Sequence, residues 1–110
     1  MIKQMFLIKR KPGISHDEFR KYYLEHHAPL VKQAFPDIVK YVINFVRQGK
    51  RESGYDAVTE IVWPDFETLK RLNDSDTYQK TIVPDEAKFI FAGGPTMFFA
   101  EEFVAKDAKE

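Results

Sequence analysis

The segment IVKYVINFVRQ, residues 38–48, limits the possible folds of this chain more than any other stretch. Successive side chains of a strand point to opposite faces of a sheet. Apolar residues here occupy both faces: Val39, Tyr41, Ile43 and Phe45 on one, and Ile38, Val42 and Val46 on the other. The segment TMFFAEEFV, residues 96–104, repeats this pattern. Helices can cover only one face of such a sheet, so a second apolar surface must cover the other, and a homodimer with sheet facing sheet is the simplest solution.

The order of the remaining elements predicts the fold class. Residues 2–10 read as a first strand, and the Ser15/Glu18 capping box starts a helix with an apolar face. Residues 49–54, GKRESG, are typical of a hairpin loop. A strand over 55–63, a helix from Pro64-Asp65 to about Leu72 with Phe66 inside, and a helical segment over about 77–91 follow. We therefore predict an α+β, ferredoxin-like β-α-β-β-α-β domain over residues 1–104, with a four-stranded antiparallel sheet and a flexible tail at 105–110.

Composition excludes several classes of function. The chain has 110 residues, with 17 Lys plus Arg against 17 Asp plus Glu, so it lacks the excess of positive charge that nucleic acid binding requires. Its apolar runs are too short to span a bilayer, so we expect no membrane partner. There is no cysteine, which excludes disulfides and thiolate chemistry and fits a cytoplasmic location.

Two adjacent histidines in YYLEHHAPL, residues 22–30, are the first candidates for chemistry. Counting from Phe19 and Tyr23 at 3.6 residues per turn, His26 falls within the apolar stripe and His27 toward its edge. Pro29 removes one helical hydrogen bond and re-aims this turn, so phase alone does not choose between the two. Side chains of adjacent helical residues diverge by about 100°, and we expect no metal site here.

The positions of three other polar residues each allow two interpretations. Glu60 shares the phase of Val58 and Val62, and so faces either water at an edge or a cavity. Asp85 falls in the apolar stripe of the last helix, where it is either a local cap after Pro84 or a buried carboxylate with a partner. Asn44 reaches either a ligand or a neighbouring backbone group.

The many aromatic residues mainly fill the core and the dimer contact, yet an aromatic pocket with one histidine and a few hydroxyls suits a hydrophobic small molecule. No phosphate-binding loop or nucleophile elbow is present, and we expect no cofactor.

Three segments together resemble the EthD domain family over about residues 3–104. SHDEFRKYYLEHHAPL resembles its serine-capped helix with an H-x-P motif, here His27-Ala28-Pro29. YDAVTEIVW is similar to its D-x-V-x-E pattern, at Asp56, Val58 and Glu60, and VPDEAKFI to its Asp-to-Phe segment, at Asp85 and Phe89.

This resemblance implies a dimeric α+β barrel. The family is named after a gene cluster for ethyl tert-butyl ether degradation, in which the member accompanies a cytochrome P450 system. Its superfamily includes polyketide cyclases, fungal dehydratases, lactone isomerases and monooxygenases, several without metal or organic cofactor. The resemblance makes His27 the main site residue, with Glu60 and Asp85 beside it.

Three functions remain open from the sequence. The first is cofactor-independent proton transfer by His27 and Glu60 in an isomerisation, dehydration or cyclisation, on a hydrophobic, oxygenated molecule. Tyr23, His26, Tyr41, Asn44 and Asp85 would then bind the substrate, with the tyrosines placed to stabilise an oxyanion. The second is an accessory protein that only binds a pathway intermediate, and the third is a monooxygenase-like oxidoreductase of the same superfamily. We expect His27 to line the pocket, His26 to pack or hydrogen-bond, and Pro29 to set the turn.

Overall fold

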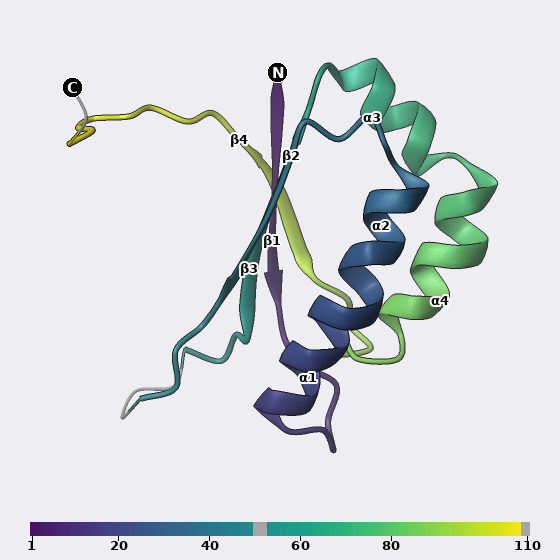
Figure 1. The fold of residues 1–110 in the computed structure, drawn as a ribbon, viewed down its shortest axis with the longest axis vertical. Coiled ribbons are helices and arrows are strands. Elements are labelled where there is room, and N and C mark those ends of the chain that lie inside the picture. The colour runs from purple at the N-terminus through teal and green to yellow at the C-terminus, as the bar shows by residue number, and fades with distance from the viewer. Residues whose placement is uncertain (50–52, 109–110) are drawn as a thin grey trace.

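A four-stranded antiparallel sheet carries the helices on one of its faces (Figure 1). The computed structural model describes residues 1–49 and 53–108. Its strands lie in the order β2-β3-β1-β4. They are β1 (Ile2–Ile8), β2 (Lys40–Phe45), β3 (Ala57–Trp63) and β4 (Thr96–Ala100). The helical segments are α1 (His16–Tyr22), η1 (Tyr23–His27), α2 (Ala28–Ala34), α3 (Phe66–Asn73), η2 (Tyr78–Ile82) and α4 (Val83–Glu86). This is the predicted ferredoxin-like β-α-β-β-α-β arrangement.

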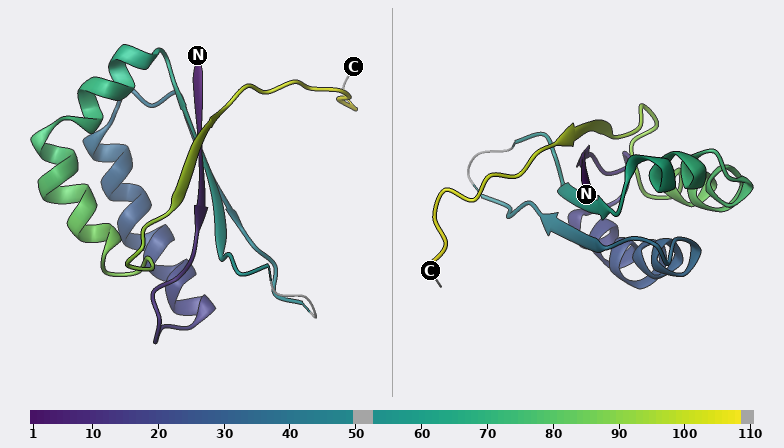
Figure 2. Two further views of the ribbon diagram at one scale, coloured as in Figure 1. Left: turned by 180° about the vertical axis from the view of Figure 1, so that it is seen from behind. Right: turned by 90° about the horizontal axis from the view of Figure 1, so that it is seen from above.

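Strand register divides the sheet into an inner face, toward the helices, and an outer face. In β3 the residues Thr59, Ile61 and Trp63 are buried, while the alternating residues between them are half-buried. Met5 of β1 pairs with Glu60 of β3 and with Phe98 of β4, so these three side chains share the outer face. The helices leave this face open, as the view from above shows (Figure 2).

The helices bury two apolar clusters against the inner face. The first contains Phe19 and Tyr23 with Ala57 and Phe89, and the second contains Val31 and Phe35 with Trp63, Leu69 and Ile82. The predicted capping box is present at the start of α1, where the Ser15 hydroxyl accepts from the Glu18 amide and the Glu18 carboxylate accepts from the Ser15 amide. The capping box satisfies amides at the start of α1, and the apolar clusters hold the helices on the sheet.

Two widened helical turns, η1 and η2, have the same design. In each, an amide bonds the carbonyl five residues earlier: Ala28 to Tyr23, and Val83 to Tyr78. The next residue is a proline in both cases, Pro29 or Pro84. Proline has no amide hydrogen, and in a regular α-helix its ring clashes with the carbonyl four residues earlier. A wide turn of this kind accommodates the proline and shifts the helical phase after it.

Some predicted boundaries were wrong, for reasons visible in the sheet. The last strand ends at Ala100 instead of residue 104, because Ala100 pairs with Lys3 near the start of β1 and no partner strand continues. The second strand covers 40–45 instead of 38–48, since β3 begins at Ala57, opposite Phe45. Residues 50–52 of the predicted hairpin loop lie outside the described residues.

Two helical expectations were also wrong. The last helix ends at Glu86 instead of about residue 91, because the chain turns there so that Ile90 can bridge to Arg10. Phe66, expected inside, is 52% exposed, since it lies on the first turn of α3 beside the edge residue Phe99. Within the described part of the chain, no helix combines the length and apolar character needed to cross a membrane.

Candidate functional site

A cavity of about 60 Å³ lies between the inner face of the sheet and the helices. Its walls are mainly aromatic and aliphatic, including Phe6, Phe35, Trp63 and Ile82. Polar side chains from the strands, the wide turns and the ends of α3 and α4 also line it, namely Gln4, Tyr23, His27, Tyr41, Thr59, Asn73, Tyr78 and Glu86. Apolar walls with a few polar groups are typical of a small-molecule site. A cavity of roughly 150 Å³ accommodates benzene, so the present volume fits only the reacting end of a larger ligand.

His27 is held in the cavity wall by Asp85. Its Nδ1 lies 2.8 Å from Asp85 Oδ2, and both side chains are buried. The Tyr22 hydroxyl donates to the other carboxylate oxygen, Oδ1, at 2.6 Å. Burial alone would raise the pKa of Asp85, but the hydrogen bonds from Tyr22 and His27 hold it below its usual value. Asp85 is therefore an ionised acceptor, and it stabilises the tautomer of His27 that carries its proton on Nδ1.

The other nitrogen of His27, Nε2, is then the basic one. No hydrogen bond from the described residues reaches it. Burial lowers the pKa of His27 below its ordinary value, although the Asp85 carboxylate opposes this shift. The imidazole is thus neutral near pH 7, with an available lone pair, as a general base requires.

A set of hydroxyls lines the same cavity. The Tyr23 hydroxyl lies 2.7 Å from Thr59 Oγ1, and Tyr41 is close enough to influence the pKa of Tyr23. Burial raises the pKa of both tyrosines well above the ordinary value, so they are neutral donors. Neutral hydroxyls in a mostly apolar cavity can stabilise the oxygen of a bound carbonyl compound as negative charge develops on it.

Glu86 is a cavity residue that the sequence reasoning missed. It directly follows Asp85 and lines the cavity, and no hydrogen bond or ion pair within the described residues engages its carboxyl group. Burial, followed by the charge of Asp85, raises its pKa to about 7. The available signal was the spacing of four in Tyr78, Ile82, Glu86 and Ile90, which matches that of Phe19, Tyr23, His27 and Val31.

The structure divides the residues expected in the site into two groups. His27, Tyr23, Tyr41 and Asp85 meet at or beside the cavity. His26, which straight-helix phase turned inward, is exposed and stacks on Tyr22 at 4.9 Å between ring centroids.

Two of the expected residues lie on the outer face of the sheet, away from His27. Glu60 accepts from Lys3 at 3.1 Å and from Asn44 at 3.0 Å. The bonds to Asn44 and Lys3 lower the pKa of Glu60, while burial opposes them, so it is an ionised partner in a polar cluster. The sheet separates this cluster from the cavity, and Glu60 and His27 cannot act on one bound molecule within one copy of the chain.

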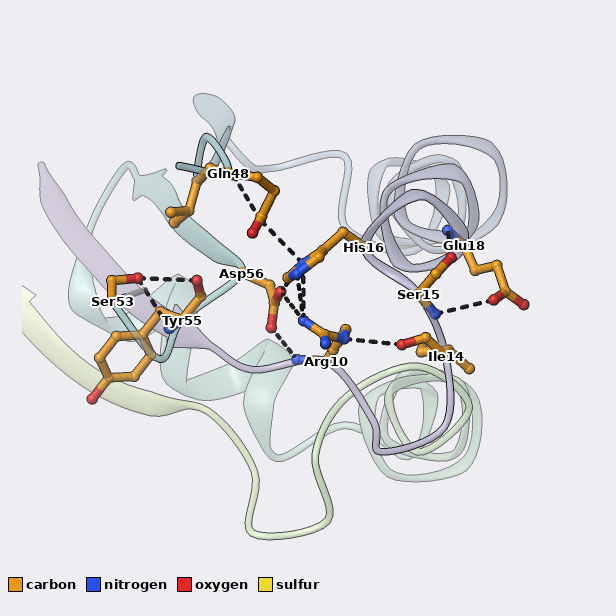
Figure 3. A network of polar contacts seen from close by, with 10 residues as sticks. Arg10, Ile14, Ser15, His16, Glu18, Gln48, Ser53, Tyr55 and Asp56 are labelled. Atoms are coloured by element: carbon orange, nitrogen blue, oxygen red, sulfur yellow. Dashed lines mark hydrogen bonds and ion pairs between the residues drawn. The ribbon is translucent and has the colours of Figure 1, made fainter. Parts of the chain in front are cut away.

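A second histidine–carboxylate pair, His16 and Asp56, connects elements of the fold (Figure 3). Asp56 Oδ1 lies 2.6 Å from His16 Nδ1 and accepts from Arg10 Nη1 at 2.9 Å, and Asp56 Oδ2 accepts from the Arg10 amide at 2.8 Å. Burial opposes ionisation of Asp56, but the bonds from Arg10 and His16 keep its pKa below the ordinary value. These contacts join the end of β1, the start of α1 and the approach to β3. Across the described ranges, no group of three or more His, Asp or Glu side chains is placed to hold a metal ion.

Known proteins similar to this chain include fungal dehydratases and decarboxylases. Dehydratase ustZ of Ustilaginoidea virens is 29% identical over 97 residues, covering 73% of this chain and 68% of that protein. The conidial pigment biosynthesis dehydratase EthD of Metarhizium robertsii is 28% identical and covers 86% and 79%, respectively. A decarboxylase of Emericella nidulans is 26% identical, covering 73% and 63%.

Solved structures share the fold. An ethyl tert-butyl ether degradation family protein from Bacillus halodurans has a TM-score of 0.72 at 22% identity, covering 94% of this chain and all of that one. A dimeric ferredoxin-like protein from Thermobifida fusca has a TM-score of 0.62 at 10% identity, covering 92% and 90%. The family model of the EthD domain matches residues 11–92, including His27, Pro29, Asp85 and Glu86. The chain belongs to the EthD domain family.

Proposed function

We propose that the cavity binds the reacting end of an uncharged, oxygenated, largely hydrophobic molecule and that His27 moves a proton on it without a cofactor. The observation that carries this proposal is the Tyr22–Asp85–His27 hydrogen-bond chain, with Asp85 and His27 buried, which leaves His27 Nε2 as a base in a mostly apolar cavity. Isomerisation, dehydration and cyclisation all begin with such a proton transfer next to a carbonyl group. The names of the fungal relatives, dehydratase among them, support this class of chemistry.

The hydroxyls of Tyr23 and Tyr41 complete the proposed site. A carbonyl oxygen of the ligand would accept hydrogen bonds from them, and these bonds strengthen as the enolate forms. Both hydroxyls remain protonated because burial raises the pKa of each tyrosine. The site therefore combines a base with donors for the developing charge.

Exchange of carbon-bound protons tests this function without knowledge of the natural substrate. Pentan-2-one is incubated with the protein in D₂O, and loss of its protons next to the carbonyl is followed by NMR. General base catalysis contributes roughly 10²–10⁴-fold, so we expect His27→Ala to slow the exchange at least 100-fold. The control is His26→Ala, which removes the exposed neighbour and should leave the rate within twofold of the unchanged protein.

Two results would overturn the proposal. Equal rates for His27→Ala and His26→Ala would remove His27 from the chemistry. Binding of pentan-2-one with no accelerated exchange by the unchanged protein would favour a protein that only binds its ligand. Binding can be followed through the indole resonance of Trp63, the single tryptophan, which lines the cavity.

We also infer that two copies pair through the outer faces of their sheets. The outer face carries apolar side chains such as Met5, Val42 and Phe98, and the helices of the described residues all lie on the other face (Figure 2). The Thermobifida fusca neighbour is described as dimeric, which supports this arrangement. Pairing of the two faces would give the dimeric α+β barrel.

A further inference from the structure

Glu86 is the one carboxyl group among the described residues lining the cavity, and the proton abstraction by His27 does not use it. Asp85 turns to His27 and Tyr22, whereas Glu86, the next residue, lines the cavity. Its charge is near enough to Tyr23, Tyr41 and Tyr78 to raise the pKa of each of them. The carboxyl group therefore lies in the same space as the hydroxyls that would hold a carbonyl compound.

The lining residues also limit the charge of the substrate. No lysine or arginine is among the described residues that line the cavity. A substrate carboxylate would lack a cation there and would face Glu86 whenever that residue is ionised, which is unfavourable in a site of low dielectric constant. This argues against a substrate that loses its own carboxylate, and for a neutral one.

We infer that Glu86 is the general acid of a dehydration, and that the substrate is an uncharged β-hydroxy carbonyl compound. This inference rests on the proposed function of His27. His27 Nε2 takes the proton from the carbon next to the carbonyl group, and the electrons of that C–H bond form the C=C bond. The C–O bond to the β-hydroxyl breaks while Glu86 donates its proton to the departing oxygen, so water leaves. The product is an enone, and the protein is left with protonated His27 and ionised Glu86.

The ionisation of Glu86 and His27 suits these roles. Burial raises the pKa of Glu86 to about 7, so a large fraction is protonated near neutrality. The lowered pKa of His27 keeps the base neutral at the same pH. Two groups whose pKa values are moved in opposite senses can act as acid and base together. The rate should fall on the alkaline side as Glu86 loses its proton.

The test compares two reactions of matched ketones. Exchange of pentan-2-one into D₂O requires only the base, whereas conversion of 4-hydroxypentan-2-one to pent-3-en-2-one also requires an acid for the leaving hydroxyl. Enone formation is followed by its ultraviolet absorbance. For Glu86→Gln we expect the ratio of elimination rate to exchange rate to fall at least 30-fold, because glutamine cannot supply a proton. Glu25→Gln, at an exposed glutamate on η1, is the control and should leave this ratio within twofold.

The outcomes separate the two proposals. If Glu86→Gln leaves the ratio unchanged while His27→Ala still stops exchange, Glu86 is not the acid and the proposed function stands. If the unchanged protein accelerates neither reaction, the base itself is wrong and the inference about Glu86 is overturned with it.

Binding tests the substrate class separately: at pH 8 the Trp63 indole resonance should respond to butanone at concentrations at least tenfold lower than to butanoate. Equal responses to the two ligands would overturn the inference of an uncharged substrate.

Discussion

Asp85 determines which nitrogen of His27 carries the proton. As an ionised acceptor 2.8 Å from Nδ1, it also raises the pKa of an imidazole whose burial lowers it. We predict that Asp85→Asn lowers the pKa of His27 further, since the hydrogen bond to the Asp85 carboxylate and the charge of that carboxylate both oppose the effect of burial, and asparagine has no charge. NMR titration of the three histidine rings measures this directly.

Asp76→Asn is the control for this titration, because Asp76 is an exposed residue paired with Lys80. It should leave the His27 titration unchanged. A His27 pKa that stays the same or rises in Asp85→Asn would show that the carboxylate does not act on this ring.

Glu86 makes stability depend on pH in a way that follows from its shift. Its pKa is raised from 4.5 to about 7, so the folded chain binds this proton more tightly than the unfolded chain. The resulting stabilisation is complete below about pH 4.5 and is lost as the pH rises toward 7 and above. We predict that the free energy of unfolding of Glu86→Gln is roughly 3 kcal/mol higher than that of the unchanged protein at pH 8, with little difference at pH 4.5.

Urea unfolding of both proteins at the two pH values checks this prediction. His27 is present in both proteins, and its own contribution to stability depends on pH in the opposite sense. Its pKa is lowered, so its stabilisation is complete above about pH 6.5 and is lost as the pH falls. An equal difference between the two proteins at both pH values would mean that Glu86 does not titrate near neutrality. If Glu86→Gln is more stable than the unchanged protein but loses the elimination reaction, Glu86 is a residue that serves chemistry at a cost in stability.

At the scale of elements, the wide turn η1 explains why His27 is buried and His26 is exposed. In a straight helix His26 would lie about 20° from the direction of Phe19 and His27 about 80° away. Because η1 holds one turn at wider spacing, Phe19, Tyr23, His27 and Val31 become one buried row instead. The capping box and the order of helices and strands along the chain follow from local sequence patterns, and the sequence was sufficient to predict them.

The site depended on features that local patterns do not specify. Strand alternation in the sequence already puts the side chains of Tyr41 and Asn44 on opposite faces of the sheet. Both residues were nevertheless expected beside one ligand. The strand register places Asn44 with Glu60 on the outer face. Glu86 follows Pro84 and Asp85 directly, and the one mark of its position was its spacing of four from Ile82 and Ile90. Both wide turns share the pattern of a tyrosine, four residues, Ala or Val, and proline, which would have indicated the second row.

At the scale of the whole molecule, the open face of the sheet is the largest feature that one copy leaves unexplained. Helices cover the inner face alone, and the chain after β4 leaves on the opposite side (Figure 1). The outer face nevertheless bears Met5, Val42 and Phe98, with the Lys3–Glu60–Asn44 cluster among them. In the proposed dimer, Glu60 would lie on the surface between the two copies, where its ion-paired cluster would set the register of pairing.

We predict that the protein sediments as a dimer, at twice the monomer mass of 12.9 kDa, and that Phe98→Asp converts it to monomers. A carboxylate on the outer face would be buried without a partner in the paired sheets, a cost of several kcal/mol for each copy. Leu24→Asp is the control, because Leu24 is 46% exposed and Phe98 44%, yet Leu24 lies on the helical side of the molecule. Monomer mass for the unchanged protein would show that no dimer forms, and dimers that survive Phe98→Asp but not Leu24→Asp would place the contact elsewhere. In either case Glu60 would lie on a solvated surface, and the polar cluster around it would have no part in assembly.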